Sequence, residues 1–201
     1  MSLDKKVKTL MLAGLVLVQE PNMGVYVDFV HSFRPGEKIE AEQHRIENVL
    51  GKPKSNLYSS LSLGHRGEVI VGYTNGYKKA ETVKCFDNKE GYDIYVHEPH
   101  IPANKQESVE VYISEDRELK PSSKWHFIGK KDVNEGIDGW MGFDMGDTKK
   151  AYWVKLKDGN SRLIDSIFYS GFEASSVKLK YPCRYMLMEK KKTKNFAKRR
   201  K

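Results

Sequence analysis

The chain has 201 residues, 39% of them hydrophobic and 31% charged, which is the composition of a globular domain that can bury its own core. The formal net charge of +8 is unevenly spread, because residues 190–201 contain eight Lys and Arg and no acidic residue. Subtracting those eight from the 35 basic residues leaves 27, which equals the 27 Asp and Glu, so the body of the chain is neutral.

The first segment, residues 1–8, is polar and basic, and an apolar run over residues 9–18 follows it. This order resembles a signal peptide, although no clean small-x-small cleavage site follows. The run is too short for a transmembrane helix, so we expect no membrane span. The alternative, which we prefer, is a retained strand of the folded body with Gly14 at a bend.

The next elements are a strand over residues 24–30, a Pro-Gly turn over residues 32–36 and a helix over residues 37–50. The helix is predicted from Ile39, Ile46, Val49 and Leu50 on one face, and from the stop at Gly51.

Short strands with period-2 alternation fill the rest of the body to about residue 187. In residues 92–98, Ile94 and Val96 point one way, together with Tyr92, whereas Asp93, Tyr95 and His97 point the other way. Turns are predicted at residues 75–76 and 158–159. The strongest strands are residues 69–73, 92–98, 109–113 and 151–156. Their alternation predicts the buried positions Ile94, Val96, Val109, Val111, Ile113, Val154 and Leu156. Trp153, inside the last of these strands, is also expected in the core.

These patterns predict an all-β protein, an antiparallel β-sandwich with one short helix. We expect residues 1–189 to form a single domain, including the apolar N-terminal segment, and residues 190–201 to form a basic tail. Such a tail can contact nucleic acid or an acidic partner, or it can be a solvated end that aids solubility. The residues available for such contacts are Lys190, Lys191, Lys192, Lys194, Lys198, Arg199, Arg200 and Lys201.

The two cysteines, Cys85 and Cys183, both lie in strand-like stretches without a CxxC motif. They can pair across a sheet in an exported protein, or remain two buried thiols. The two cysteines and the six scattered histidines do not have the spacing of an ordinary zinc site. The pair His97 and His100 supplies too few ligands to hold a metal ion by itself. We therefore predict no metal site and no cofactor.

A series of short motifs runs through the body in a characteristic order. They are SFRPG (32–36), LGKP (50–53), LSLG (61–64), GEVIV (67–71), DIYVHE (93–98), VEVYISED (109–116), WVKLKD (153–158) and GFEASSV (171–177). This order resembles the galactose-binding-like, or discoidin-like, jelly-roll modules of bacterial cell-surface proteins. The resemblance implies a jelly roll, usually a non-catalytic binding or adhesive module that uses loops at one end for sugars.

Some modules of this fold hold a structural calcium ion, and the resemblance raises that question here. In the last motif Glu173 and Ser175 stand where the family has two aspartates. Calcium prefers several hard oxygen ligands, so the loss of a carboxylate at Ser175 argues against a tight calcium site on residues 171–176.

The candidate ligand-binding residues carried over from these motifs are Asp93, His97, Glu98, Asp158 and Glu173. Trp140 joins them, because it lies in a Gly-rich segment suited to an exposed ring. Each has a plainer alternative as a turn, strand-end or core residue.

Enzyme motifs are missing from the sequence, which has no GxSxG, HExxH, Walker or GxGxxG pattern. We therefore expect a non-catalytic β-sandwich that binds a carbohydrate or protein ligand at a cell or particle surface. The alternative is a structural assembly protein, such as a phage virion or tail component, whose basic tail contacts nucleic acid or an acidic neighbour. Either can form a homo-oligomer.

Overall fold

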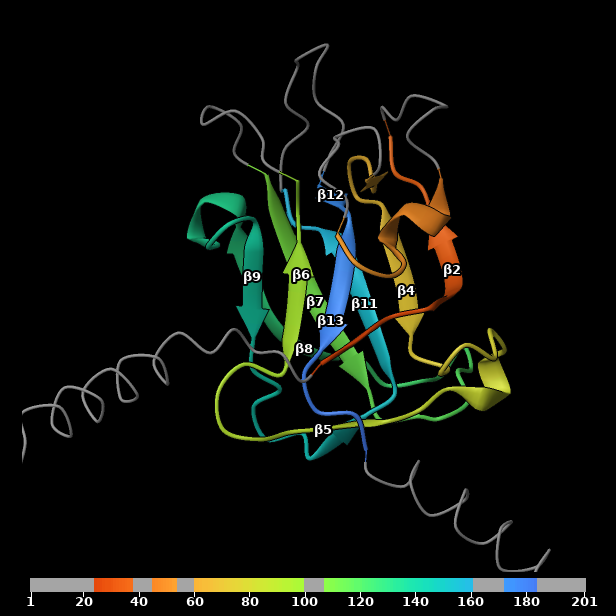
Figure 1. Ribbon diagram of the computed structural model, residues 1–201. Helices are drawn as coiled ribbons and strands as arrows, with labels where there is room; N and C mark the ends of the chain where they lie inside the picture. Colours follow the sequence, from red (N-terminus) through yellow and green to blue (C-terminus); the bar gives the residue numbers. More distant parts are fainter. Residues whose placement is uncertain (1–23, 38–44, 54–59, 100–106, 161–171, 184–201) are drawn as a thin grey trace, which may run out of the picture.

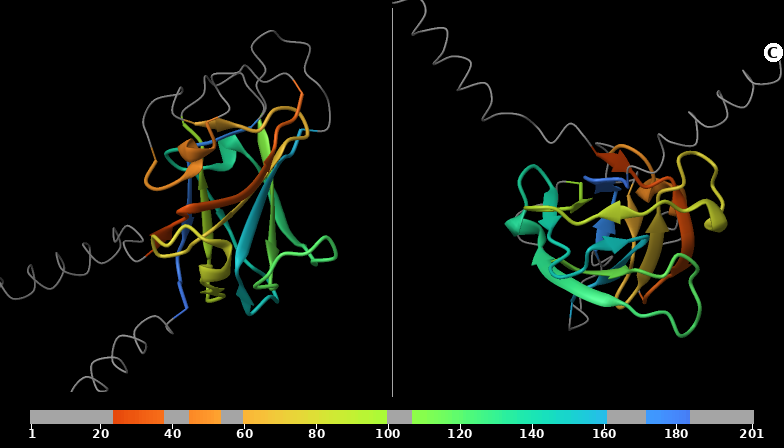
Figure 2. Two further views of the ribbon diagram at one scale, coloured as in Figure 1. Left: turned by 90° about the vertical axis from the view of Figure 1, so that its right-hand side faces the viewer. Right: turned by 90° about the horizontal axis from the view of Figure 1, so that it is seen from below.

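Two antiparallel sheets face each other across one apolar core in the computed structural model (Figure 1). The structure describes residues 24–37, 45–53, 60–99, 107–160 and 172–183, so the N-terminal segment and the basic tail lie outside the described residues. The predicted antiparallel β-sandwich is confirmed. The view from below in Figure 2 shows the two layers end on.

The larger sheet has five strands in the order β2-β4-β11-β7-β8, and every neighbouring pair is antiparallel. Its strands are β2 (Phe29–Arg34), β4 (Glu68–Gly72), β11 (Trp153–Asp158), β7 (Ser108–Ser114) and β8 (His126–Asp132). The central strand β11 pairs over nearly its whole length with both neighbours, which fixes its inward and outward positions.

The smaller sheet has four strands in the order β1-β13-β6-β9, also antiparallel throughout. Its strands are β1 (Val25–Tyr26), β13 (Ser176–Leu179), β6 (Ile94–His97) and β9 (Trp140–Phe143). In β6, Ile94 and Val96 are fully buried, whereas Tyr95 and His97 are half-buried on the outer face.

Two short ladders close the ends of the sandwich. β12 (Glu173–Ala174) pairs with β3 (Leu61–Ser62) at the upper end in Figure 1, and β10 (Lys150–Ala151) pairs with β5 (Phe86–Asp87) at the lower end. The 3-10 helices are η2 (Ile46–Val49), η4 (Ala80–Thr82) and η5 (Val133–Glu135). A disulfide joins Cys85 to Cys183, which selects the paired alternative for the two cysteines.

The core confirms the predicted buried positions. All seven are fully buried. These seven residues are Ile94, Val96, Val109, Val111, Ile113, Val154 and Leu156. The strands have the predicted alternation because each sheet has one face on the core and one face outside.

Local predictions were wrong where long-range contacts decide the conformation. The helix does not begin at Glu37, because Glu37 forms a β-bridge with His65, and its described end is only the 3-10 helix η2. Residues 38–44 lie outside the described residues. The turn expected at residues 32–36 starts later, since β2 continues through Arg34 in register with Glu68.

Candidate functional site

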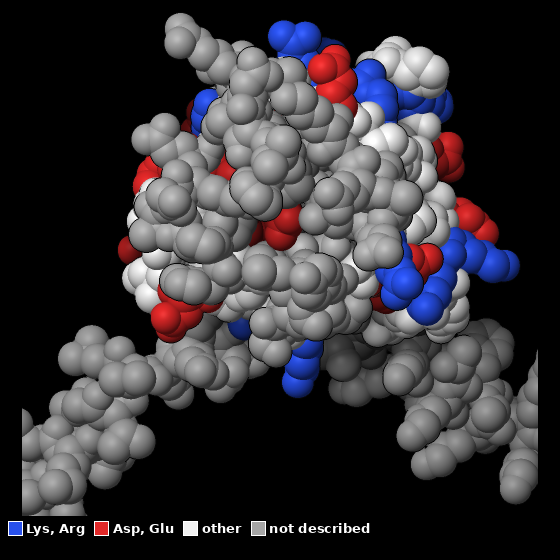
Figure 3. Space-filling model, turned by 90° about the horizontal axis from the view of Figure 1, so that it is seen from above, with Lys and Arg blue, Asp and Glu red and all other residues white. Residues whose placement is uncertain are grey.

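The six candidate residues from the sequence fall into three places in the fold. Asp93 lies before β6 near the lower end, and Glu98, Asp158 and Glu173 lie at the upper end. His97 and Trp140 face each other across β6 and β9 on the outer face of the smaller sheet. Figure 3 looks down on the upper end, where acidic side chains are visible near its centre.

Asp158, the last residue of β11, is a buried structural carboxylate. It accepts hydrogen bonds from the backbone N–H groups of Arg66 (3.1 Å) and Phe172 (3.2 Å) and from the side chain of Asn160 (2.9 Å). Another close neighbour is His65, whose Nδ1 lies 3.7 Å from Asp158 Oδ2. Burial raises the Asp158 pKa, while these hydrogen bonds oppose the rise. The carboxylate therefore ties three loops together.

Glu98, Glu107 and Glu173 form a second buried acidic group at this end. The backbone N–H of Glu173 donates to Glu98 Oε1 at 3.4 Å, and the Ser60 hydroxyl donates to Glu173 Oε2 at 3.1 Å. Burial raises the pKa of Glu98 to about 10, and the hydrogen bond and charge of Glu107 add to the rise. Burial and the neighbouring Glu107 therefore favour the protonated form of Glu98.

The described residues contain no group of three or more His, Cys, Asp or Glu side chains placed to hold a metal ion.

Asp93 is the one candidate whose predicted orientation was wrong. It was expected on the outer face of a strand, but its side chain is fully buried. Asp93 accepts hydrogen bonds from the backbone N–H groups of Lys89 (3.0 Å) and Met145 (3.2 Å), so it joins the loop before β6 to the loop after β9. Burial raises its pKa.

His97 and Trp140 are the two candidates that the structure brings into contact. Their rings lie edge to face with centroids 4.8 Å apart, and His97 Nδ1 is 2.6 Å from the hydroxyl oxygen of Ser175. Burial lowers the His97 pKa, and a hydrogen bond with the Asp138 backbone opposes that change. His97 is therefore neutral at pH 7, and it holds the Trp140 ring at the surface. Beside Trp140, Ile137 is 80% exposed.

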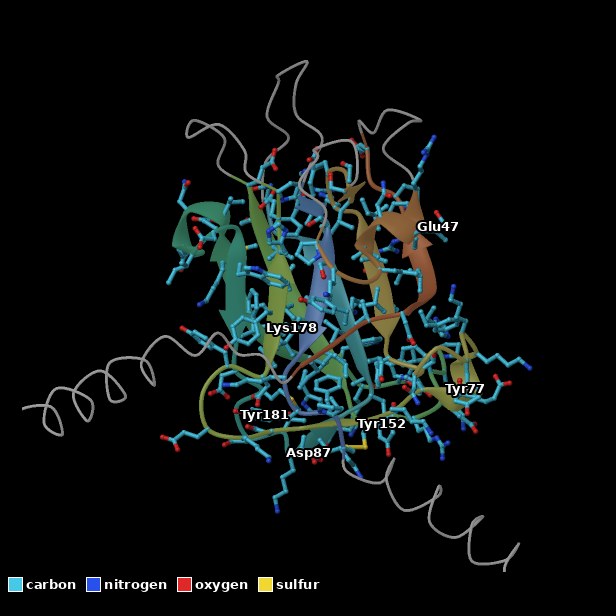
Figure 4. The ribbon with its side chains drawn as sticks, viewed as in Figure 1. Glu47, Tyr77, Asp87, Tyr152, Lys178 and Tyr181 are labelled. Atoms are coloured by element: carbon cyan, nitrogen blue, oxygen red, sulfur yellow. A yellow bond between two sulfur atoms is a disulfide. The ribbon has the colours of Figure 1, made fainter. Side chains whose placement is uncertain are left out.

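Below this pair, a row of aromatic and basic side chains crosses the same outer face. Register places Tyr26, Lys178, Tyr95 and Gly142 side by side on β1, β13, β6 and β9. Figure 4 labels Lys178 near the middle of this sheet. Tyr92, 47% exposed, lies over Gly142, where a Cβ atom would overlap its ring.

Lysines are packed against these rings. Lys131 Nζ is 4.6 Å from the Tyr92 ring centroid and 3.4 Å from its hydroxyl, and Lys178 Nζ is 5.9 Å from the Tyr26 ring centroid. Tyr92 and Tyr95 also meet edge to face at 6.2 Å. We call this surface, Tyr26, Tyr92, Tyr95, His97, Trp140, Lys131 and Lys178, the aromatic face.

Most of the aromatic face was missed from the sequence. Strand alternation predicted Tyr95 and His97 on the same outer side of β6, and the structure agrees. It predicted Tyr92 on the inner side with Ile94 and Val96, but Tyr92 is 47% exposed and its ring contacts Tyr95. The contact between Tyr92 and Lys131 joins segments of two different sheets, so no local sequence pattern predicts it.

The outer face of the larger sheet is built differently. Two of its basic side chains pair with acids, since Arg34 lies 3.3 Å from Glu68 and Lys157 lies 3.6 Å from Glu110. A third, Lys155, places Nζ 4.4 Å from the Trp125 ring centroid. Trp153, expected in the core, points outward there and is nevertheless buried. The rings of Phe29 and His31 cover it, and its Nε1 donates to the Arg117 carbonyl at 3.1 Å.

Comparison with known proteins gives the fold a context. No family model and no curated protein matches the chain. Among solved structures, it is similar to the CBM32 of AlyQ in complex with 4,5-unsaturated mannuronic acid, at 8% identity and a TM-score of 0.45, over 77% of this chain and 96% of that one. It is also similar to the C-terminal domain of a chitobiase from Bacteroides fragilis, at 14% identity and a TM-score of 0.43, over 77% and 92% of the two chains.

Among the residues that the structure describes, no helix is both long and apolar enough to cross a membrane.

Proposed function

We propose that this protein is a non-catalytic module that binds carbohydrate through its aromatic face, at a cell or particle surface. The observation that carries the proposal is the set of aromatic rings held at the surface of the smaller sheet, with Tyr92 47% exposed and Trp140 seated on His97.

The chemistry of a sugar matches such a surface. One side of a pyranose ring presents C–H groups, which pack on the face of an aromatic ring, while its hydroxyl groups need hydrogen-bonding partners. Tyr and Trp offer an apolar body and a polar tip in one side chain. On the aromatic face the hydroxyls of Tyr92 and Tyr95 and the indole N–H of Trp140 supply those tips.

The sheet also makes the rings rigid. Trp140 and Tyr95 belong to paired strands, and Tyr92 lies against the backbone of Gly142. Rigid rings lose little conformational entropy on binding, which favours affinity for a weakly held ligand.

A non-catalytic role fits the placement of the carboxylates. A glycosidase needs a pair of carboxyl groups on either side of the bond that it cleaves. Glu98, Asp158 and Glu173 are at most 6% exposed, and none lies on the aromatic face. The disulfide between Cys85 and Cys183 supports a location in an oxidising environment, as expected at an external surface.

The test is affinity electrophoresis of the full chain through gels that contain single polysaccharides, both neutral and acidic. We expect at least one polysaccharide to retard the protein. Tyr92→Ala and Trp140→Ala should each weaken that retardation on the order of tenfold, as for a central aromatic contact.

The matched control is Phe127→Ala, which removes a 57% exposed ring from the outer face of the larger sheet. It should leave retardation unchanged. Retardation that survives both Tyr92→Ala and Trp140→Ala, or that Phe127→Ala removes, would place carbohydrate binding elsewhere.

A further inference from the structure

Trp140 is carried by a two-residue hairpin turn over residues 137–140. The backbone N–H of Ile137 donates to the Trp140 carbonyl at 3.0 Å, and the Trp140 N–H donates to the Ile137 carbonyl at 2.9 Å. Between them, Asp138 and Gly139 have φ values of 50° and 78°. Positive φ at both central residues is the pattern of a type I′ turn. The turn fixes the backbone at the start of β9, while its tilt over β6 depends on the contacts that it makes there.

The end of β6 supplies those contacts, at the upper end of the smaller sheet (Figure 1). The N–H of Glu98 donates to the Gly139 carbonyl at 2.9 Å. The turn lies so close to β6 that a Cβ atom at Gly139 would overlap the Glu98 carbonyl oxygen and lie 3.1 Å from His97 Nε2. The His97 side chain also hydrogen-bonds the Asp138 backbone, and its ring meets the Trp140 ring at 4.8 Å. The imidazole therefore contacts both the turn and the indole ring.

Ser175 binds the other ring nitrogen of His97. Its hydroxyl oxygen lies 2.6 Å from His97 Nδ1, whereas another acceptor for that hydroxyl, the His97 carbonyl, is 3.5 Å away. The serine is fully buried, and its N–H donates to the His97 carbonyl at 2.9 Å.

The proton positions follow from the two partners of the imidazole. The hydrogen bond with the Asp138 backbone opposes the fall in the His97 pKa, so His97 is its donor and the carbonyl its acceptor. A neutral imidazole has one N–H donor and one acceptor nitrogen. Nε2 faces the turn and carries the proton, which leaves Nδ1 to accept the Ser175 hydroxyl. Ser175 thus fixes both the orientation and the tautomer of the ring.

We propose that Ser175 is a positioning residue of the carbohydrate site. Its hydroxyl orients the His97 ring, and His97 in turn sets the tilt of the 137–140 turn and the place of the Trp140 indole on the aromatic face. The inference rests on the proposed carbohydrate-binding function and adds a residue that touches no ligand. Because Ser175 is fully buried, it acts only through His97.

Removal of the hydroxyl should cost affinity without removing any ring. In Ser175→Ala the Trp140 ring remains, but His97 loses the bond that fixes its orientation, so the ligand must order the turn when it binds. Ordering one side chain on binding weakens affinity by roughly twofold to tenfold. We therefore expect Ser175→Ala to weaken polysaccharide retardation about fivefold. In a protein that already carries Trp140→Ala, Ser175→Ala should have no further effect, because both residues act through the same ring.

The matched control is the next residue, Ser176. It is equally buried, and its hydroxyl donates to the Gly51 carbonyl at 2.6 Å instead of to His97. Ser176→Ala should leave retardation unchanged. Equal losses in the two serine variants would mean that both hydroxyls support the fold in general, and would overturn the proposal.

A readout without ligand separates positioning from binding. The near-UV circular dichroism of Trp140 is the difference between a protein and the same protein carrying Trp140→Phe, and its intensity depends on a fixed ring environment. Ser175→Ala should weaken this signal, and Ser176→Ala should not. His97→Phe keeps a ring beside Trp140 but loses both hydrogen bonds, so it should weaken the signal as Ser175→Ala does. An unchanged signal in Ser175→Ala, or in His97→Phe where Ser175→Ala does not fold, would contradict the positioning role.

The binding experiment uses the full chain in gels that contain galactan or xylan, which are neutral, or polygalacturonate, which is acidic. Equal retardation of the wild type and Ser175→Ala by a polysaccharide that binds would overturn the positioning role and leave the proposed function intact. If none of the three retards the wild type, the proposed function fails and this inference fails with it.

Discussion

Replacing Glu98 by Gln should make the protein more stable in neutral and alkaline solution. Glu98 is fully buried, and burial together with Glu107 raises its pKa from 4.5 to about 10. The folded state therefore keeps a proton that the unfolded state releases above its own pKa. Because the folded state binds more protons, stability falls as the pH rises through this range.

The size of the effect follows from proton linkage. One proton held only by the folded state lowers the free energy of unfolding by at most about 1.4 kcal/mol per pH unit. Between pH 5 and pH 8 the Glu98 contribution is then at most about 4 kcal/mol, a large part of a typical total of roughly 5–15 kcal/mol. Glu98→Gln stays neutral, keeps an oxygen for the Glu173 N–H group, and offers an N–H donor to Glu107.

The assay is urea unfolding of the full chain at pH 5, 6, 7 and 8. Glu98→Gln should flatten the loss of stability with pH, while the exposed control Glu47→Gln should keep the wild-type slope. An unchanged slope, or a variant that is less stable at pH 8, would show that the carboxyl pair does not share a proton. Calcium that stabilises the wild type but neither Glu98→Gln nor Glu173→Ala would show a shared cation, against the expectation of no tight calcium site on residues 171–176.

Two further predictions concern the core and the tail. Val96→Ala and Val111→Ala, each at a fully buried site, should lower the free energy of unfolding by roughly 1–3 kcal/mol in denaturant titrations, and a loss below the measurement error would mean that the core repacks. Deleting residues 190–201 should abolish salt-sensitive binding to nucleic acid, of about micromolar strength or weaker, and leave the body folded. Nucleic-acid binding that survives the deletion would show that the tail is not the binding element. Failure of the shortened chain to assemble with its partners would favour the structural assembly alternative.

The alternation of buried and exposed residues, which repeats over a few positions, could be predicted from the sequence. Alternation alone identified Ile94, Val96, Val111 and Val154 as buried, because each strand has one face on the core. It failed for Asp93, which precedes β6. There the carboxylate turns inward to bind the N–H of Met145, a partner 52 residues away.

The candidate site depended even more on distant contacts. Trp140 was identified from its Gly-rich segment, but its partner His97 follows from the register of β6 and β9. Trp153 looked like a core residue and is buried on the outer face instead, because Phe29 from β2 covers it. Local sequence patterns encode which residues are apolar, whereas strand register decides which polar and aromatic side chains meet.

The division of charge in the fold argues for a face, not an end, as the binding surface among the described residues. At the upper end Asp158 and Glu173 are buried and bound to backbone and hydroxyl groups, and burial raises the pKa of Glu98. Exposing any of them to a ligand would break hydrogen bonds that join separate loops, at a cost of about 1–3 kcal/mol for each unsatisfied group. Ligand binding on the aromatic face requires no such rearrangement. Its rings are already at the surface, with Tyr92 47% exposed.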